Sequence, residues 1–186
     1  MEISKTLYVT KREEWRNWLE ENYKNEGEIW LVYYRKKTGI PRIPYNDAVE
    51  EALCYGWIDS INKSMSDEKY AQRFNPRKPK SEYSQTNKER LKKLVKQGKV
   101  ISEVLESLRK VDLEEFEYPA DIMKAINENE KSWENYQKYS GPYRRIRIAY
   151  IDDGRKRPGE YEKRLNHFIR MTVQDKQFGF GIEEYY

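Results

Sequence analysis

The sequence ALCYGWIDSINKSMSDEKYAQRFNP spans residues 52–76 and holds the end of a predicted helix followed by a predicted β-hairpin. Gly56 permits the left-handed backbone that ends many helices. Residues 58–63 and 69–75 are typical of strands, and residues 64–67, Ser-Met-Ser-Asp, lie between them. Side chains alternate along the second strand, with Tyr70, Gln72 and Phe74 on one face and Ala71, Arg73 and Asn75 on the other.

Strand and helix patterns also alternate before this hairpin. A short strand is predicted at residues 7–9, and Thr10 with Glu13 has the form of a capping box that opens a helix. Residues 28–35, EIWLVYYR, are typical of a central strand. Asp47 opens a second helix. The predicted order as far as residue 80 is therefore β-α-β-α-β-β.

Beyond residue 80 the apolar residues fall only at helical spacing. Four amphipathic helices are predicted, around residues 91–95, 101–108, 143–151 and 161–169. The sequence therefore predicts an α+β fold, in which an all-helical C-terminal half packs on a small N-terminal sheet.

The chain is expected to form one domain over residues 1–176, with a sheet-containing half at 1–80 and a helical half at 81–176. The 186-residue length is sufficient to enclose a core. Five tryptophans and sixteen tyrosines argue against disorder, although 37% of the residues are charged. Residues 177–186 are predicted to be a flexible aromatic tail unless their rings dock.

Composition also bears on compartment and assembly. A single cysteine excludes an internal disulfide, and the first fifteen residues, MEISKTLYVTKREEW, hold no apolar segment typical of a signal peptide. No run of about 18 apolar residues occurs, so no membrane-spanning helix is expected. We predict a cytoplasmic monomer.

Charge is unevenly distributed along the chain. Residues 69–99 contain eleven Lys or Arg against two Glu, a local net charge of +9, whereas residues 102–134 have a local net charge of −6. Residues 144–170 carry nine basic and four acidic residues, a local +5. The basic segments indicate a surface for anionic partners, but solvated faces, or faces that attract each other, give the same pattern.

Trp57 and Asp59 are expected to lie on one side of a strand that follows Gly56. An indole beside a carboxylate would suit a flat, cationic or hydrogen-bonding ligand. Arg73 on the neighbouring strand would then pair with Asp59 or hold an anion. The alternative is structural, with a buried tryptophan and an ion pair between Asp59 and Arg73.

A basic loop follows the hairpin at residues 77–80, stiffened by two prolines. It leads to Ser84, a predicted N-cap, and to a helix whose first turn carries Asn87. Arg77, Lys78 and Asn87 are thus candidate ligands for a phosphate or carboxylate at the helix start. The interleaved aromatic residues of this region would also suit single-stranded nucleic acid, and an ordinary polar surface is the third possibility.

Catalytic chemistry has weaker support in the sequence. Cys54 is predicted near a helix C-terminus, where the helix dipole disfavours a thiolate, and a small core residue is the favoured interpretation. The single histidine, His167, lies far away in sequence, so nothing local pairs the two. One His and one Cys do not form a zinc site, and no nucleotide-binding loop is present. We expect no catalytic residue, metal or cofactor.

Seven motifs are shared, in order, with a known family. They are REEW (12–15), WLV (30–32), ALCYGWID (52–59), RFNPRKPKS (73–81), NKER (87–90), SGPYRR (140–145) and KRPGE (156–160). In these motifs the chain resembles the bacterial YdeI or OmpD-associated family over nearly its whole length. The resemblance implies a link to bacteriocin protection and an envelope partner, and it brings no established reaction.

Three hypotheses follow. The favoured one is a binding or stress-protection protein that recognises an anionic small molecule or an envelope-related partner through Trp57, Asp59, Arg73, Arg77, Lys78 and Asn87. The second is a nucleic-acid-binding protein that uses residues 69–99. The third is an enzyme of unrecognised mechanism centred on Cys54 or Asp59.

Overall fold

The computed structural model describes residues 2–79, 81–109, 111, 113 and 115–186. The chain divides into two compact units. The sheet unit comprises Met1–Glu82 and Arg90–Leu113, and the helical unit comprises Tyr83–Glu89 and Glu114–Tyr186. Helix α3 (Gln85–Lys96) contributes its first residues to the helical unit and the remainder to the sheet unit.

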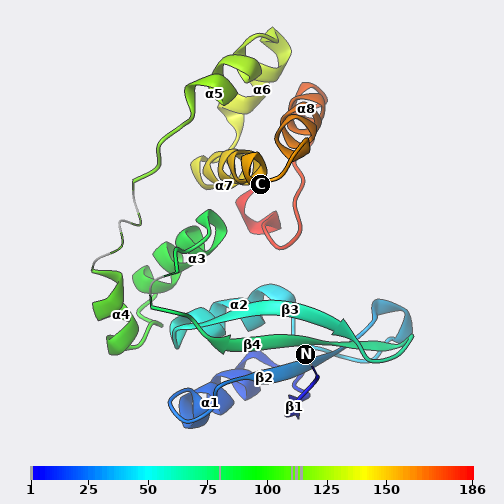
Figure 1. Ribbon diagram of the computed structural model, residues 1–186, viewed down its shortest axis with the longest axis vertical. Helices are drawn as coiled ribbons and strands as arrows, with labels where there is room; N and C mark the ends of the chain where they lie inside the picture. Colours follow the sequence, from blue (N-terminus) through cyan, green and yellow to red (C-terminus); the bar gives the residue numbers. More distant parts are fainter. Residues whose placement is uncertain (1, 80, 110, 112, 114) are drawn as a thin grey trace. The chain divides into compact units, whose positions relative to one another are not determined.

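A four-stranded sheet organises the sheet unit (Figure 1). Its strands are β1 (Thr6–Leu7), β2 (Ile29–Tyr34), β3 (Trp57–Ser64) and β4 (Lys69–Pro76), in the spatial order β1-β2-β4-β3. β1 pairs with β2 in parallel, and the other neighbours are antiparallel. The accompanying helices are α1 (Arg12–Asn22), the 3₁₀ helix η1 (Lys36–Thr38), α2 (Tyr45–Cys54) and α4 (Ser102–Leu108). The predicted β-α-β-α-β-β order and the α+β class are confirmed.

Aromatic side chains join α1 to one face of the sheet. The Trp15 ring lies 5.4 Å from Phe74 of β4, and the Trp18 ring lies 5.8 Å from Trp57 of β3. Ile29 is paired with Phe74 in register and is fully buried, so it lies on the same face. This face therefore holds a core of large rings, which suits a short sheet with few aliphatic residues.

The start of α1 corrects one prediction. The helix begins at Arg12, so Glu14 and not Glu13 occupies its third position. The Glu14 carboxylate accepts hydrogen bonds from the backbone N–H groups of Thr10 (2.8 Å) and Lys11 (3.2 Å). The predicted pairing of Thr10 with Glu13 is wrong by one residue, because Glu13 and Glu14 both offer a carboxylate near the helix start and helix boundaries are fixed by sequence only to within one or two residues.

Gly56 ends α2 as predicted. Its φ is +74°, and an added Cβ atom would lie 3.2 Å from Val104 Cγ2. The Gly56 carbonyl accepts a hydrogen bond from Arg77 N, which fixes the end of β4 beside this turn. β3 and β4 form the predicted hairpin, with an irregularity in register between Asp59 and Asn62.

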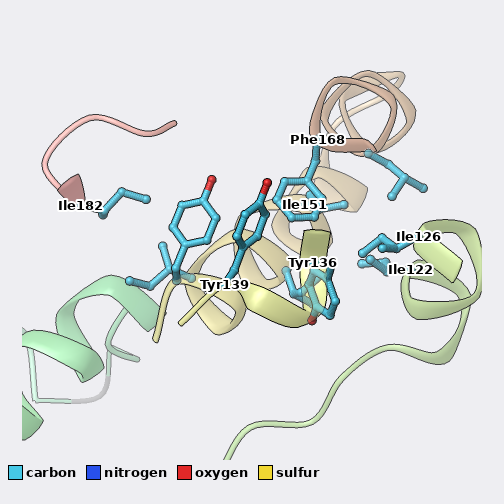
Figure 2. Close-up of a cluster of buried hydrophobic side chains, with 11 residues drawn as sticks. Ile122, Ile126, Tyr136, Tyr139, Ile151, Phe168 and Ile182 are labelled. Carbon is cyan, nitrogen blue, oxygen red and sulfur yellow. The ribbon is translucent and has the colours of Figure 1, made fainter. Parts of the chain in front are cut away.

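The helical unit is built from α5 (Ala120–Asn127), α6 (Glu130–Lys138), α7 (Gly141–Asp153), η2 (Gly154–Lys156), α8 (Glu160–Val173) and η3 (Glu183–Tyr185). Figure 2 shows the isoleucine, tyrosine and phenylalanine side chains that form its core, among them Ile126, Tyr136 and Phe168. The predicted helices near residues 143–151 and 161–169 correspond to α7 and α8. α5 and α6 are not among the predicted helices, because segments of eight and nine residues are shorter than the window over which a helical period is recognised.

The last ten residues have docked rings. Tyr143 Oη accepts a hydrogen bond from Phe178 N at 3.0 Å, and the rings of Tyr143 and Tyr186 lie 5.4 Å apart. Ile182 is 4% exposed and belongs to the core cluster in Figure 2. The sequence predicted a flexible tail unless its rings docked, and the structure shows this docking.

Candidate functional site

Five of the six predicted ligand residues belong to the sheet unit, and Asn87 belongs to the helical unit. Trp57 is 1% exposed, and its indole N–H donates to the Tyr23 carbonyl at 3.2 Å. Trp57 therefore packs in the core, as the alternative prediction of a buried tryptophan stated. Its role as a ligand platform stays a prediction.

Asp59 is held by neutral groups. Its Oδ2 atom accepts hydrogen bonds from Gln72 Nε2 at 2.8 Å and from Tyr45 Oη at 3.1 Å. In register Asp59 is paired with Phe74, so Arg73 points to the opposite face of the sheet. The predicted ion pair between Asp59 and Arg73 is therefore wrong.

Arg73 instead pairs with the residue that precedes β2. Its Nε atom lies 2.5 Å from a carboxylate oxygen of Glu28, and its NH1 donates to Asn75 Oδ1. Hydrogen bonds from Ser4 and Arg73 lower the pKa of Glu28. The Arg73 guanidinium is thus engaged within the sheet unit.

Ser84 lies between the basic loop and α3, and it caps the N-terminus of the helix. The Ser84 hydroxyl accepts from Asn87 N at 3.3 Å, so the predicted N-cap is confirmed. Lys78 is exposed, and its carbonyl accepts from Ser81. Lys80 of the predicted basic loop lies outside the described residues. The ligand roles of Arg77, Lys78 and Asn87 stay predictions.

Cys54 does not have the environment of a nucleophile. It is fully buried, and burial raises the pKa of its thiol to about 11. This agrees with the interpretation of Cys54 as a core residue. Within the described part of the chain, no group of three or more His, Cys, Asp or Glu side chains has the arrangement of a metal site.

The helical unit contains a pocket of about 520 Å³. It lies between residues of α7, α8 and the C-terminal tail, and Thr86 at the start of α3 also lines it. The lining residues are Thr86, Ile146, Arg147, Tyr150, Glu160, Lys163, Arg164, His167, Phe178, Gly179, Phe180 and Ile182. Its volume falls within the range of about 300–1,000 Å³ that is typical of small-molecule sites.

Arg147 is the buried cation of this pocket. It is 6% exposed, and its Nε atom has no hydrogen-bond partner among the described residues. Its guanidinium carbon lies 4.0 Å from the ring centre of Phe178 and 4.9 Å from that of Tyr150. Burial lowers the pKa of Arg147. An arginine remains protonated even so, and the pocket therefore contains a buried positive charge without an ion-pair partner in the described chain.

The other two cations of the pocket have partners. Lys163 Nζ lies 3.2 Å from Glu160, and Arg164 Nε lies 3.3 Å from the same carboxylate. Arg164 also donates to the Tyr150 carbonyl at 2.7 Å, and its guanidinium lies over the Tyr150 ring. Glu160 therefore offsets part of the charge of this side of the pocket.

His167 completes the polar lining. Its Nδ1 atom lies 2.8 Å from Arg170 Nη2, which can only donate, so Nδ1 accepts and the ring is neutral. Burial and the charges of Arg170 and Arg147 lower the pKa of His167. The neutral ring leaves its Nε2–H as a hydrogen-bond donor.

This depressed pKa predicts a pH dependence of stability. The unfolded chain, with a histidine pKa of about 6.5, binds a proton more readily than folded His167. The free energy of unfolding should therefore decrease as the pH falls from about 7 to about 5, through the unfolded value and toward the folded one. Urea denaturation at several pH values tests this. His167→Gln, which keeps an acceptor for Arg170, should show a flatter profile, and an identical profile would contradict the assignment.

Sequence reasoning found only part of this pocket. The sequence shows residues 144–147 as part of a basic segment, but nothing in it distinguishes Arg147 from Arg144 and Arg145. The spacing of Glu160 and Arg164, and of Lys163 and His167, places each pair on one face of α8. Phe178, Phe180 and Ile182 were assigned to a flexible tail, and no local pattern connects them to α7.

The fold and this pocket define an α+β protein with a cation-containing pocket in its helical unit. Residues 7–107, more than half of the chain, match the family described as Domain of unknown function (DUF8412), and the chain belongs to that family. Residues 115–175 match the family described as Bacteriocin-protection, YdeI or OmpD-Associated. No curated protein and no solved structure matches the chain significantly.

Apart from Tyr83–Glu89, the two matches follow the division into units. The first match ends at residue 107 and the second begins at residue 115, and the sheet unit ends at Leu113. The YdeI or OmpD-associated resemblance is confirmed for the motifs at residues 140–145 and 156–160, whereas the earlier motifs fall within the other matched region. No helix in the described ranges has both the length and the apolar character needed to span a membrane.

Proposed function

We propose that the helical unit is a binding module for a small organic anion, which it holds through Arg147. The observation that carries this proposal is the buried Arg147 guanidinium, which lines the pocket with its Nε atom unpartnered among the described residues. Burying a charge without a counter-ion is costly, and an anionic ligand would remove that cost. The proposal retains the anionic small molecule predicted from the sequence and places it at different residues.

The other hypotheses have less support. Several cations of residues 69–99 are already engaged, since Arg73 pairs with Glu28 and Lys93 with Glu50. Nucleic-acid binding by this segment stays a prediction, as do the cytoplasmic location and a role in stress protection. The buried Cys54 thiol, with its raised pKa, does not favour thiolate catalysis.

The proposal predicts that Arg147→Met removes anion binding. The probes are two organic anions, 2-naphthoate and 2-naphthyl phosphate, measured by isothermal titration calorimetry and by thermal shift at pH 8. A ligand that binds only the folded chain raises its melting temperature. We expect at least one probe to bind, and Arg147→Met to weaken it by about tenfold or more, because a charge-assisted hydrogen bond contributes about 1.5–3 kcal/mol.

Arg144→Met is the matched control. Arg144 is on the same helix, lies over the Tyr136 ring and is absent from the pocket lining. The same loss of one charge at this position should leave binding within about twofold, since a difference below about 0.4 kcal/mol is expected for a charge outside the pocket. Equal losses of affinity in Arg147→Met and Arg144→Met would mean that the effect comes from the net charge of the protein. If the unmodified chain binds neither probe, the proposal is rejected.

A further inference from the structure

Arg147 is the cation of the pocket lining that has no carboxylate partner in the described chain. Lys163 and Arg164 share the Glu160 carboxylate, and Asp153, which pairs with Lys156 at 2.8 Å, lies 3.8 Å from Arg164. His167 is neutral where Arg170 donates to it. Arg147 alone has no carboxylate partner among the described residues, so one negative charge beside its guanidinium is matched. A second negative charge would have to share Lys163 and Arg164 with Glu160.

The orientation of Arg147 restricts the shape of the anionic group. The rings of Phe178 and Tyr150 lie over the guanidinium, at 4.0 and 4.9 Å from its central carbon. A ligand must therefore approach the edge of the guanidinium, where the N–H groups lie. Two oxygens in one plane fit this edge, which is the geometry of a carboxylate bound by arginine.

The tail supplies an apolar wall for the rest of the ligand. Phe180 lines the pocket and is 80% exposed, although large apolar side chains are usually buried. Ile146, Phe178 and Ile182 also contribute apolar surface to the lining. A flat apolar ligand body would cover Phe180 and the neighbouring wall.

The backbone of this wall is held in place. Tyr143 Oη contacts both the N–H and the carbonyl of Phe178, and Tyr186 Oη donates to the Gly179 carbonyl at 2.9 Å. Gly179 has a φ of +143°, and an added Cβ atom would lie 2.5 Å from Ile182 Cδ1. The wall is therefore a positioned element, and it lies beyond residue 175, where the family match ends.

We infer that the pocket selects a monocarboxylate with a flat aromatic body, and that Phe180 is a specificity-determining residue for that body. This inference rests on the proposed anion-binding function and adds the chemical class of the ligand. It also assigns the selection of the ligand body to residues outside the part of the chain that matches the YdeI or OmpD-associated family.

Four probes of the full chain test the inference by calorimetry at pH 8. They are 2-naphthoate, its neutral amide 2-naphthamide, the doubly charged 2-naphthyl phosphate, and acetate, which has the carboxylate without the ring. We expect 2-naphthoate to bind about tenfold more tightly than each of the other three, which corresponds to about 1.4 kcal/mol. Phe180→Ala should weaken 2-naphthoate about fivefold, in the range of one aromatic contact, and leave acetate unchanged.

The outcomes separate the two proposals. Tighter binding of 2-naphthyl phosphate that depends on Arg147 would overturn the monocarboxylate inference and leave the anion-binding function intact. Equal binding of 2-naphthamide, insensitive to Arg147→Met, would overturn both. Tyr118→Ala, which removes an exposed ring of the same unit outside the pocket, is the control for Phe180→Ala. Equal losses in these two variants would remove the assigned role of Phe180.

Discussion

Trp57→Ala will destabilise the sheet unit by about 3–5 kcal/mol, the usual cost of deleting a buried aromatic side chain. Trp57 is 1% exposed, lies against Trp18 and donates its N–H to the Tyr23 carbonyl. The alanine variant loses this packing and leaves the carbonyl without its indole donor. Urea denaturation followed by tryptophan fluorescence measures the effect, because four of the five tryptophans lie in the sheet unit.

Trp57→Phe is the informative companion variant. It retains a ring in the core and should cost clearly less than Trp57→Ala, since a smaller cavity remains. The sequence also predicted that a ligand pocket would depend on Trp57. If Trp57→Phe folds normally and binds 2-naphthoate as the unmodified chain does, that ligand role is rejected for this probe. Loss of 2-naphthoate binding in a folded Trp57→Phe protein would instead support a role of Trp57 in ligand binding.

Glu51→Ala is the second substitution with a large expected effect, a destabilisation of about 3–5 kcal/mol. The Glu51 side chain is 2% exposed and forms ion pairs with both Arg12 and Arg16 on α1. Removal of its carboxylate leaves Arg16 without this ion pair, while Arg12 keeps Asp47 and Glu50, so the cost falls mainly on the partly buried Arg16 and on the buried site that the carboxylate filled. Equilibrium urea denaturation measures this loss.

The matched control is an ion pair at the surface. Glu134→Ala removes the partner of Lys131, and both side chains are more than half exposed. Such pairs contribute about 0–1 kcal/mol, so this variant should be close to the unmodified chain. A Glu51→Ala protein as stable as Glu134→Ala would show that the buried pairs with Arg12 and Arg16 contribute little net stability.

Periodicity predicted most of the sheet unit because its elements have strong local signals. The β-branched and aromatic run at residues 28–35 corresponds to β2, and the alternation in residues 69–75 corresponds to β4. Gly56 adopts the positive φ expected of a helix-ending glycine. Errors occurred where the pattern left two choices open, as at the start of α1, where Glu14 and not the adjacent Glu13 accepts the capping hydrogen bonds.

Ion-pair partners could not be predicted in the same way. The alternation along β4 already places Arg73 on the face opposite Phe74, whereas the pairing with Asp59 was expected because the two residues lie on neighbouring strands of the hairpin. The register shows that Asp59 lies on the Phe74 face, and Arg73 pairs with Glu28 across the sheet. Partners of this kind are separated by tens of residues, and only the strand order brings them together.

Local spacing and composition were therefore sufficient for the fold class, the hairpin and the helices of residues 143–151 and 161–169, since each shows a periodic pattern of apolar residues within a short stretch of sequence. The pocket depended on the tertiary structure. Arg147 differs from Arg144 and Arg145 only in its surroundings, because the docked tail covers it with Phe178 while Glu89 pairs with Arg145. The surroundings that bury Arg147 come from residues distant in sequence, such as Phe178, so no local pattern predicts its burial.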